Sequence, residues 1–239
     1  MNFWRLNIYK PWLVKLGHTL AQHWKLLMTL LVLTPALLAV AYIWVPVPAT
    51  PLMVWRVMQG EGWHRTWVPL EKLPKVIPQA VIASEDNAFC QHNGVDWGAV
   101  KDVYEEWQAG EGLRGASTIS MQVARNVFLW PGQDPIRKGL ELVVTYGIES
   151  LWSKARIMEI YLNVAEWGPG VYGIEAAAQH HFGKSAKRLT REEVFRLVSI
   201  LPSPRHWRPT SQRRWIYRNI NRLQRRVGQL QGEMGCISR

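Results

Sequence analysis

A pair of acidic residues follows an apolar run in the stretch AVIASEDNAFCQHNG, residues 80–94. Glu85 and Asp86 come directly after the run, and Phe89 and His92 follow at short range. A carboxylate at the end of an apolar helix is partly removed from water, which raises its pKa and suits it to general-base catalysis. The alternative is a carboxylate that only completes a helix end, with His92 as a structural hydrogen-bonding partner. This stretch alone does not decide between the two.

A second stretch, GASTISMQVARN at residues 115–126, combines small residues, hydroxyls and a cation. Ser117 and Thr118 suit the N-cap of a helix, and a helix N-terminus favours anions. Gln122 and Arg125 lie three residues apart and share a helical face. The alternative is an ordinary capped helix without a ligand.

The third stretch, RKGLE, places Arg137 and Glu141 four residues apart on one helical face, with Lys138 beside them. Such a trio is either a cationic clamp for phosphate or a surface ion pair worth a few tenths of a kcal/mol, roughly. A fourth stretch, residues 154–186, joins two helices through a glycine-rich turn. The first of these helices is marked by Lys154, Glu159, Tyr161 and Asn163.

Helical periodicity dominates from residue 69 onward, and no alternating run is long enough to predict a sheet. Apolar residues recur at steps of three and four, and Thr190 and Glu193 form a capping box. We therefore predict an all-α fold, with helices over residues 74–84, 117–129, 136–151, 154–167, 173–183, 190–201 and 211–230. The last helix carries arginines opposite its apolar face, either for lipid headgroups or as solvated charge: Arg213, Arg214, Arg218, Arg222, Arg225 and Arg226.

Residues 26–45, LLMTLLVLTPALLAVAYIWV, carry no charge. About 20 residues at about 1.5 Å each span a hydrocarbon core of about 30 Å. No acid precedes this stretch, but bases do: Arg5, Lys10, Lys15 and Lys25. The positive-inside rule therefore predicts that residues 1–25 are cytoplasmic and that the chain after the stretch lies outside. A cleaved signal peptide is the alternative, but its apolar core is about 7–15 residues long. The stretch VPVPATPLMV, residues 45–54, carries three prolines and should be extended, and we place a linker over residues 46–64.

The composition points to an anionic partner. The chain has 29 Lys+Arg against 18 Asp+Glu, a net charge of +11, and 14 Trp. Because the predicted topology disfavours nucleic acid, anionic lipids and phosphorylated envelope substrates remain. Cys90 and Cys236 are too few for a metal cluster. Their spacing neither supports nor excludes a disulfide, and we expect two free thiols because the chain can build an ordinary core.

Taken in order, the four stretches resemble the peptidoglycan glycosyltransferase family, found in bifunctional penicillin-binding proteins and as stand-alone enzymes. The family pattern E-D-x-x-F-x-x-H-x-G is matched from Glu85 to Gly94, and G-G-S-T-I-T-Q-Q is similar to GASTISMQ. R-K-x-x-E is matched from Arg137 to Glu141. K-x-x-I-L-E-x-Y-L-N is similar to KARIMEIYLN, and the family's ending G-x-x-x-A-A-x-x-Y-F-G-K is similar to GIEAAAQHHFGK. The resemblance covers about residues 65–210.

Several positions depart from the family pattern. Ala116 replaces a glycine, Met121 replaces a glutamine next to Gln122, and His181 replaces an aromatic residue. Pro202 stands where many relatives carry a lysine, which puts one pyrophosphate contact in question. The chain after the last motif is too short for a transpeptidase domain, so we expect the monofunctional form, with a glycosyltransferase domain over residues 65–239.

The resemblance implies a lysozyme-like helical fold, with a smaller membrane-facing lobe at about residues 97–135, and a polymerising activity. Its substrates would be lipid II, a disaccharide–pentapeptide on undecaprenyl pyrophosphate, and the lipid-linked glycan chain. The acceptor 4-hydroxyl attacks the anomeric carbon with inversion, and undecaprenyl pyrophosphate leaves. Glu85 would be the base, and Glu141 the second acid, which either orders nearby cations or holds a divalent cation such as Mg²⁺ or Mn²⁺. The substrate site would comprise Phe89, His92, Ser117, Thr118, Gln122, Arg125, Arg137, Lys138 and Asn163.

The implied setting is the bacterial inner membrane, with a periplasmic catalytic domain in contact with membrane lipids and with other cell-wall synthesis or division proteins. Two other functions stay open. A glycan-cleaving lytic transglycosylase or lysozyme of similar fold would not need RKGLE, because no pyrophosphate leaves. A catalytically silent membrane scaffold would be expected to lose Glu85 or Glu141.

Overall fold

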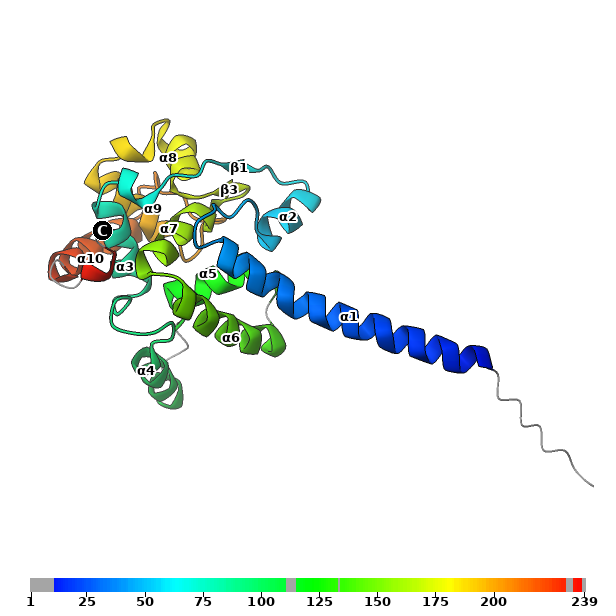
Figure 1. The fold of residues 1–239 in the computed structure, drawn as a ribbon. Coiled ribbons are helices and arrows are strands. Elements are labelled where there is room, and N and C mark those ends of the chain that lie inside the picture. Colours follow the sequence, from blue (N-terminus) through cyan, green and yellow to red (C-terminus); the bar gives the residue numbers. More distant parts are fainter. Residues whose placement is uncertain (1–10, 111–114, 133, 231–233, 238–239) are drawn as a thin grey trace, which may run out of the picture. The chain divides into compact units, whose positions relative to one another are not determined.

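The computed structural model describes residues 11–110, 115–132, 134–230 and 234–237, and the chain divides into two units, residues 1–42 and 43–239. The first unit is one helix, α1 (Pro11–Ala41), shown in blue in Figure 1. Its segment Gln22–Ala41 has a mean hydropathy of 1.9 and is long and apolar enough to cross a membrane. It is the one such candidate among the described residues and fits the predicted anchor, and Arg5 and Lys10 lie outside those residues.

The helix ends earlier than predicted. The apolar run continues to Val45, but α1 stops at Ala41 and a turn follows. Val45 precedes Pro46, and a residue before proline is disfavoured in the helical conformation. The last four residues of the predicted span are thus not helical.

The second unit is built mainly from helices, which confirms the all-α class. In chain order the α-helices of its described residues are α2 (Pro51–Met58), α3 (Val76–Glu85), α4 (Trp97–Gln108), α5 (Ile119–Phe128), α6 (Pro135–Leu151), α7 (Lys154–Val164), α8 (Ile174–Phe182), α9 (Arg191–Ile200) and α10 (Arg214–Gln229). Short 3-10 turns lie at η1 (Leu70–Lys72), η2 (Ala186–Arg188) and η4 (Gly235–Ile237). The capping box of Thr190 and Glu193 is present at the start of α9.

Helix α2 corrects the prediction that residues 45–54 are extended, because it begins at Pro51. The Oγ1 atom of Thr50 accepts a hydrogen bond from the backbone N–H of Met53 at 3.3 Å, and Pro51 occupies the first helical position. An N-cap threonine followed by proline is a helix-start signal, because proline suits a position whose N–H has no partner. The prediction of an extended segment rested on the three prolines and did not take this helix-start signal into account.

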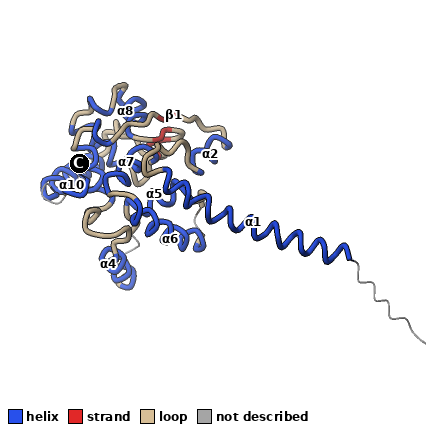
Figure 2. The backbone as a smooth tube through the Cα atoms, viewed as in Figure 1, coloured by secondary structure: helices blue, strands red, loops and turns tan. Residues whose placement is uncertain are grey.

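The structure contains a small sheet, although no run in the sequence is long enough to predict one. Strands β1 (His64–Arg65), β2 (Glu166–Gly168) and β3 (Val171–Tyr172) pair in the order β1-β3-β2. β1 runs parallel to β3, and β2 runs antiparallel to it. Figure 2 shows how little of the chain is strand, drawn in red. Strands of two or three residues are too short to show an alternating pattern in the sequence.

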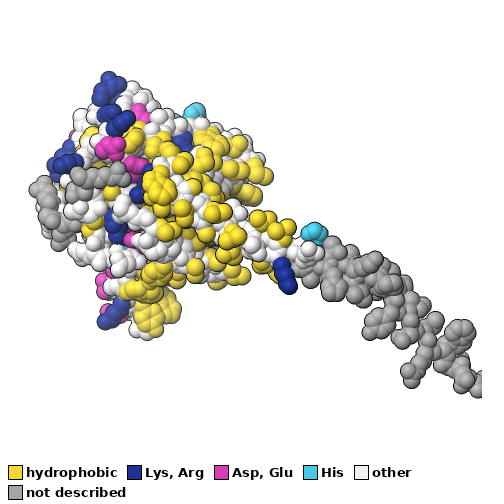
Figure 3. Space-filling view, viewed as in Figure 1, with side chains coloured by type: hydrophobic (Ala, Val, Ile, Leu, Met, Phe, Trp, Pro, Cys, Tyr) yellow, Lys and Arg dark blue, Asp and Glu magenta, His cyan; other side chains and the backbone are white. Residues whose placement is uncertain are grey.

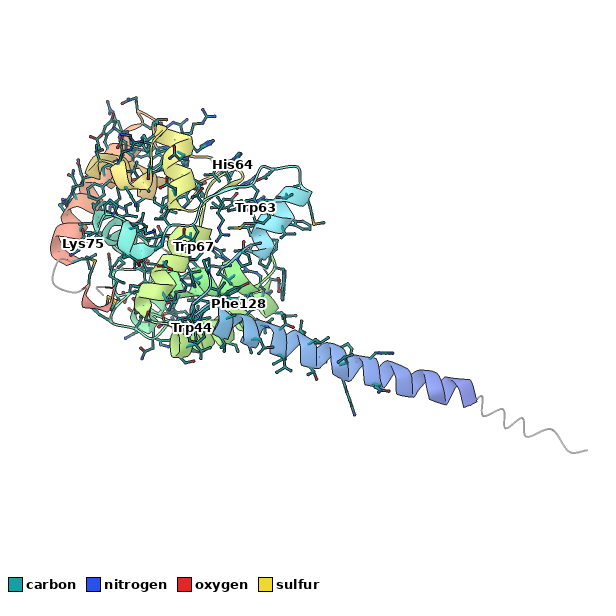
Figure 4. The ribbon with its side chains drawn as sticks, turned by 45° about the horizontal axis from the view of Figure 1, so that its top comes forward. Trp44, Trp63, His64, Trp67, Lys75 and Phe128 are labelled. Carbon is teal, nitrogen blue, oxygen red and sulfur yellow. A yellow bond between two sulfur atoms is a disulfide. The ribbon has the colours of Figure 1, made fainter. Side chains whose placement is uncertain are left out.

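The segment before α3 is held against α7 by arginine contacts. Arg65 donates from Nε to the backbone oxygen of Asn163 at 3.0 Å, and Arg156 donates to the backbone oxygen of Val45 at 2.6 Å. The ring of Trp67 lies 5.2 Å from the guanidinium carbon of Arg65 and 5.5 Å from that of Arg156. Figure 4 labels Trp67 beside α7. These contacts join parts of the chain that are almost 100 residues apart.

Helix α7 lies at the centre of the unit, where residues 155–164 are all buried. It packs against α5, which also packs against α6, while α3 packs against α9 and α10. Helix α10 uses Ile216, Ile220, Leu223 and Val227 for this contact. This arrangement brings the ends of α3 and α5 together with α6 and α7.

Large apolar side chains are exposed on α2, α4 and α6. Figure 3 shows them gathered over the parts of the second unit where these helices lie. They are Val54, Trp55, Val57, Met58, Trp97, Tyr104, Trp107, Ile136, Leu140, Val143, Tyr146 and Leu151. An apolar surface of this extent is typical of a membrane or protein contact.

Candidate active site

Glu85 is the last residue of α3 and is partly buried. Its carboxylate accepts hydrogen bonds from Ser84 Oγ at 3.0 Å and from Gln122 Nε2 at 3.3 Å. Burial raises the pKa of Glu85 above its ordinary value, the two hydrogen bonds oppose that rise, and the charge of Asp86 adds to it. A carboxylate with a raised pKa at a partly open position suits general-base work.

Asp86 is a structural clamp. Its carboxylate accepts from the backbone N–H of Ile119 at 2.9 Å and lies 2.9 Å from His92 Nε2. The backbone N–H of Gly94 donates to His92 Nδ1 at 3.1 Å, so the proton of the neutral ring is on Nε2 and points to Asp86. The clamp joins the end of α3 to the start of α5, and His92 acts within it as a positioning residue.

Gly94 brings the same loop against α6. It has φ +99°, and a Cβ there would lie 2.8 Å from Thr145 Cγ2. The hydroxyl of Thr118 donates to the backbone oxygen of Gly94 at 2.5 Å and accepts from the N–H of Met121 at 3.1 Å. Thr118 is buried, so its hydroxyl caps α5 and fastens the loop, and only Ser117 of the two hydroxyls stays partly exposed.

Gln122 connects the carboxylate of Glu85 with Tyr161 of α7. Its Oε1 accepts a hydrogen bond from the Tyr161 hydroxyl at 3.4 Å, while its Nε2 donates a hydrogen bond to the Glu85 carboxylate. Burial and then the negative charge of Glu85 raise the pKa of Tyr161 well above its ordinary value, and the positive charge of Arg125 opposes them. Glu85, Gln122, Tyr161 and Arg125 therefore form one electrostatic group.

The RKGLE residues form a second group on α6. Glu141 is fully buried, and its two carboxylate oxygens are 2.6 Å from Lys138 Nζ and 3.4 Å from Arg137 Nη1. Lys138 Nζ also donates to Ser117 Oγ at 3.3 Å, which joins α6 to the start of α5. Lys138 remains exposed and Arg137 lines a pocket together with Arg125, so both cations can reach an anion.

The surroundings of Glu141 do not fit a divalent cation. Both of its oxygens are engaged by positive groups, which would repel a metal ion. Among the described residues, no group of three or more His, Cys, Asp or Glu side chains is placed to hold one. In this structure Glu141 forms ion pairs with Lys138 and Arg137.

Comparison with known proteins decides the family. Residues 53–230 match the family model described as Transglycosylase. The chain is 48% identical over 203 residues to the biosynthetic peptidoglycan transglycosylase of Rhodospirillum centenum, covering 84% of this chain and 88% of that protein. It is 42% identical over 214 residues to the protein of that name from Caulobacter vibrioides, covering 89% and 93%. The chain belongs to the transglycosylase family.

This membership makes the protein a glycosyltransferase and confirms the family, the fold class and the enzyme class inferred from the motifs. A further relative of the transglycosylase, from Agrobacterium fabrum, is 44% identical over 220 residues, which is 89% of this chain and 96% of that protein. These alignments span nearly the full length of the relatives.

The fourth motif builds the scaffold of the transglycosylase. Asn163 is fully buried, and its side chain bonds to the backbone N–H and C=O of Val68 at 2.7 and 2.9 Å. Glu159 accepts from the N–H of Leu70 at 2.8 Å and pairs with Arg156. The structure thus does not bring Asn163 to Glu85, because its side chain bonds to Val68 in the segment before α3 and to the backbone oxygen of Glu159 within α7.

Two departures from the family pattern lie away from the site. Met121 is only 3% exposed and packs in the core, whereas Gln122 faces Glu85. The glutamine that the family carries at position 121 would therefore place its amide in the core and not beside Glu85. His181 donates from Nε2 to the backbone oxygen of Trp167 at 3.0 Å, and burial lowers the pKa of its imidazole.

The cysteines form a disulfide, so the expectation of two free thiols is wrong. Cys90 and Cys236 are joined, with 5.6 Å between their Cα atoms. The bond connects the loop after Glu85 to the C-terminal turn across 146 residues of sequence. Only the packing of η4 against α7 brings the two residues together, and spacing cannot show that.

Two further residues support the site: Arg226, which no motif includes, and Lys154, which belongs to the fourth motif. Arg226 of α10 was predicted on the basic outer face, but it is partly buried and donates to the backbone oxygen of Ala83 in the last turn of α3. Lys154 Nζ lies 4.6 Å from the ring centre of buried Phe89 and 2.7 Å from Glu149. A cation near the carboxyl end of a helix is favourable, and this general rule is the available signal for Arg226.

Proposed function

We propose that this transglycosylase polymerises lipid II into linear glycan strands of peptidoglycan. The growing chain is transferred from undecaprenyl pyrophosphate to the 4-hydroxyl of the acceptor sugar, with inversion at the anomeric carbon. The observation that carries the proposal is Glu85, a partly buried carboxylate with a raised pKa that lies in one group with Gln122, Tyr161 and Arg125.

The chemistry assigns a role to each group. The acceptor oxygen forms a bond to the anomeric carbon as its proton passes to Glu85. The bond from that carbon to the pyrophosphate oxygen breaks, and its electron pair stays on the pyrophosphate. Arg125, Arg137 and Lys138 stabilise the developing negative charge. Ser117 and Gln122 position the sugars and phosphates, while Phe89, His92 and Thr118 hold the loop that carries the base.

The cellular setting is part of the proposal. Residues 26–45 would include the inner-membrane span, residues 1–25 would be cytoplasmic, and the catalytic domain from residue 65 would be periplasmic, after a connection over 46–64. The exposed apolar residues of α2, α4 and α6 would contact membrane lipids beside the substrate. Other cell-wall synthesis or division proteins are the expected protein partners.

The test is polymerisation of labelled lipid II in detergent by the wild type and by Glu85→Gln. We expect long glycan strands from the wild type and none from the variant, at equal thermal stability or better. A wild type that leaves lipid II unused but digests finished glycan would replace this proposal with the lytic alternative. Equal polymerisation by both proteins would remove Glu85 as the base.

A further inference from the structure

A pocket of about 420 Å³ lies beside the site and contains an arginine that no motif includes. Its size falls within the range of about 300–1,000 Å³ that is usual for ligand pockets. Arg125 of α5 and Arg137 of α6 line it, as expected for a phosphate clamp. The third arginine is Arg56 of α2, from the part of the chain expected to be a linker.

Two of these arginines have a buried donor without a partner. Within the described residues, four buried side-chain nitrogen or oxygen atoms make no hydrogen bond, and two of them are Arg56 Nε and Arg137 Nε. An unsatisfied buried donor costs about 1–3 kcal/mol, and more when it is charged. Neither guanidinium group is therefore fully satisfied by protein partners, although the two Nε atoms are themselves closed to solvent.

The charge of the pocket also favours an anion. Three arginines and one acid, Glu166, line it. Glu166 is bound by Arg205 at 2.8 Å, while its closest approach to Arg56 is 3.7 Å. Arg125 makes no ion pair within the described part of the chain. The pocket therefore keeps an excess of positive charge.

The remaining lining identifies the kind of anion. Leu52, Leu129 and Trp130 form an apolar wall beside the arginines. On α2, the neighbours of Arg56 point apolar side chains to the surface, with Trp55 46% and Val57 43% exposed. The helix thus presents a cation to the pocket and apolar groups to its surroundings, which suits an anionic headgroup with a hydrocarbon chain.

We propose that Arg56 is a third ligand of the prenyl pyrophosphate group, acting with Arg125 and Arg137. The apolar wall takes the first part of the prenyl chain. This inference rests on the proposed function, in which prenyl pyrophosphate is the leaving group. Arg56 binds that group and stabilises the charge it gains as the glycosidic bond forms.

The chain offers a matched control. Arg56 and Arg205 both pair with Glu61 and Glu166, but Arg205 does not line the pocket. Arg205→Gln therefore disturbs the same ion-pair network, and more strongly, since its contacts of 2.7 and 2.8 Å are shorter than those of 3.7 Å made by Arg56.

The test compares the full-length wild type, Arg56→Gln and Arg205→Gln in one detergent. Binding of farnesyl pyrophosphate, inorganic pyrophosphate and farnesol is measured by titration calorimetry, and kcat and KM are measured with lipid II. We expect Arg56→Gln to weaken farnesyl pyrophosphate binding about tenfold or more, while Arg205→Gln stays within about twofold of the wild type.

Equal weakening by both variants, or none by Arg56→Gln, would overturn the role of Arg56. Inorganic pyrophosphate that binds as tightly as farnesyl pyrophosphate would overturn the role of the apolar wall. If the wild type fails to polymerise lipid II but still binds farnesyl pyrophosphate through Arg56, the pocket assignment stands and the proposed function falls. If polymerisation is normal in Arg56→Gln, this inference alone falls.

Discussion

The carboxylate of Asp86 lies 2.9 Å from the backbone nitrogen of Ile119 and accepts its hydrogen bond. One buried side chain thereby holds the end of the helix that carries Glu85 against the start of the helix that carries Gln122. The same carboxylate accepts from His92, so two donors depend on it. Of the acidic pair in the first motif, Glu85 is thus the proposed base, and Asp86 holds the two helices in position.

Asp86→Ala should lower the free energy of unfolding by about 2–4 kcal/mol, because each buried donor left unpaired costs about 1–3 kcal/mol. Chemical denaturation measures this loss. The control is Asn87→Ala, since Asn87 is exposed and should change stability by about 0.5 kcal/mol or less. Similar stabilities of the two variants would contradict the clamp.

Glu85→Gln should make the protein more stable at pH 7. The folded pKa of Glu85 is raised above 4.5, so the stability linked to its protonation is present at acid pH and is lost as pH rises through the folded pKa. The neutral variant avoids this loss, which amounts to about 1.4 kcal/mol for every unit of pKa. The gain, measured by denaturation at pH 7 and again below pH 4.5, should vanish at the lower pH. A variant less stable than the wild type at pH 7 would refute the burial argument.

Gln122→Met should move the acid limb of the pH–rate profile upward. The Gln122 N–H favours the charged form of Glu85, so its removal raises the pKa of the base further, and more alkaline solution is needed to deprotonate it. The pH dependence of kcat/KM with lipid II measures the shift. Tyr161→Phe, which removes only the contact to Gln122 Oε1, should move the limb less. An unmoved limb in Gln122→Met would show that this hydrogen bond is weak.

Cys236→Ser should lower the free energy of unfolding by about 2–5 kcal/mol, because the disulfide closes a long loop and restricts the unfolded chain. Cys90→Ser should give the same loss, and the double variant no more than either. Reduction of the wild type is the matched measurement and should reproduce the effect. A stability that is insensitive to reduction would mean that the bond does not form in solution.

Local patterns in the sequence predict the apolar N-terminal segment, the helices from α3 to α10 other than α4, and the order of the motifs. These features depend on local periodicity and capping, such as the Thr190 box at α9, and the motifs led to the family that comparison confirmed. Three features were missed: α2 and α4, which begin at the capping residues Thr50 and Asp96, and the three-stranded sheet, whose strands are too short to show a pattern.

The contacts between residues that are distant in the sequence are visible only in the tertiary structure. It placed Arg56 beside Arg125 and Arg137, moved Asn163 from the site to the scaffold, turned Arg226 toward α3 and paired Cys90 with Cys236. Each of these contacts joins residues about 70 to 150 positions apart, which is a matter of packing between elements. A spacing along the chain predicts which residues share one helix face, but the faces that meet are chosen by burial of the whole core.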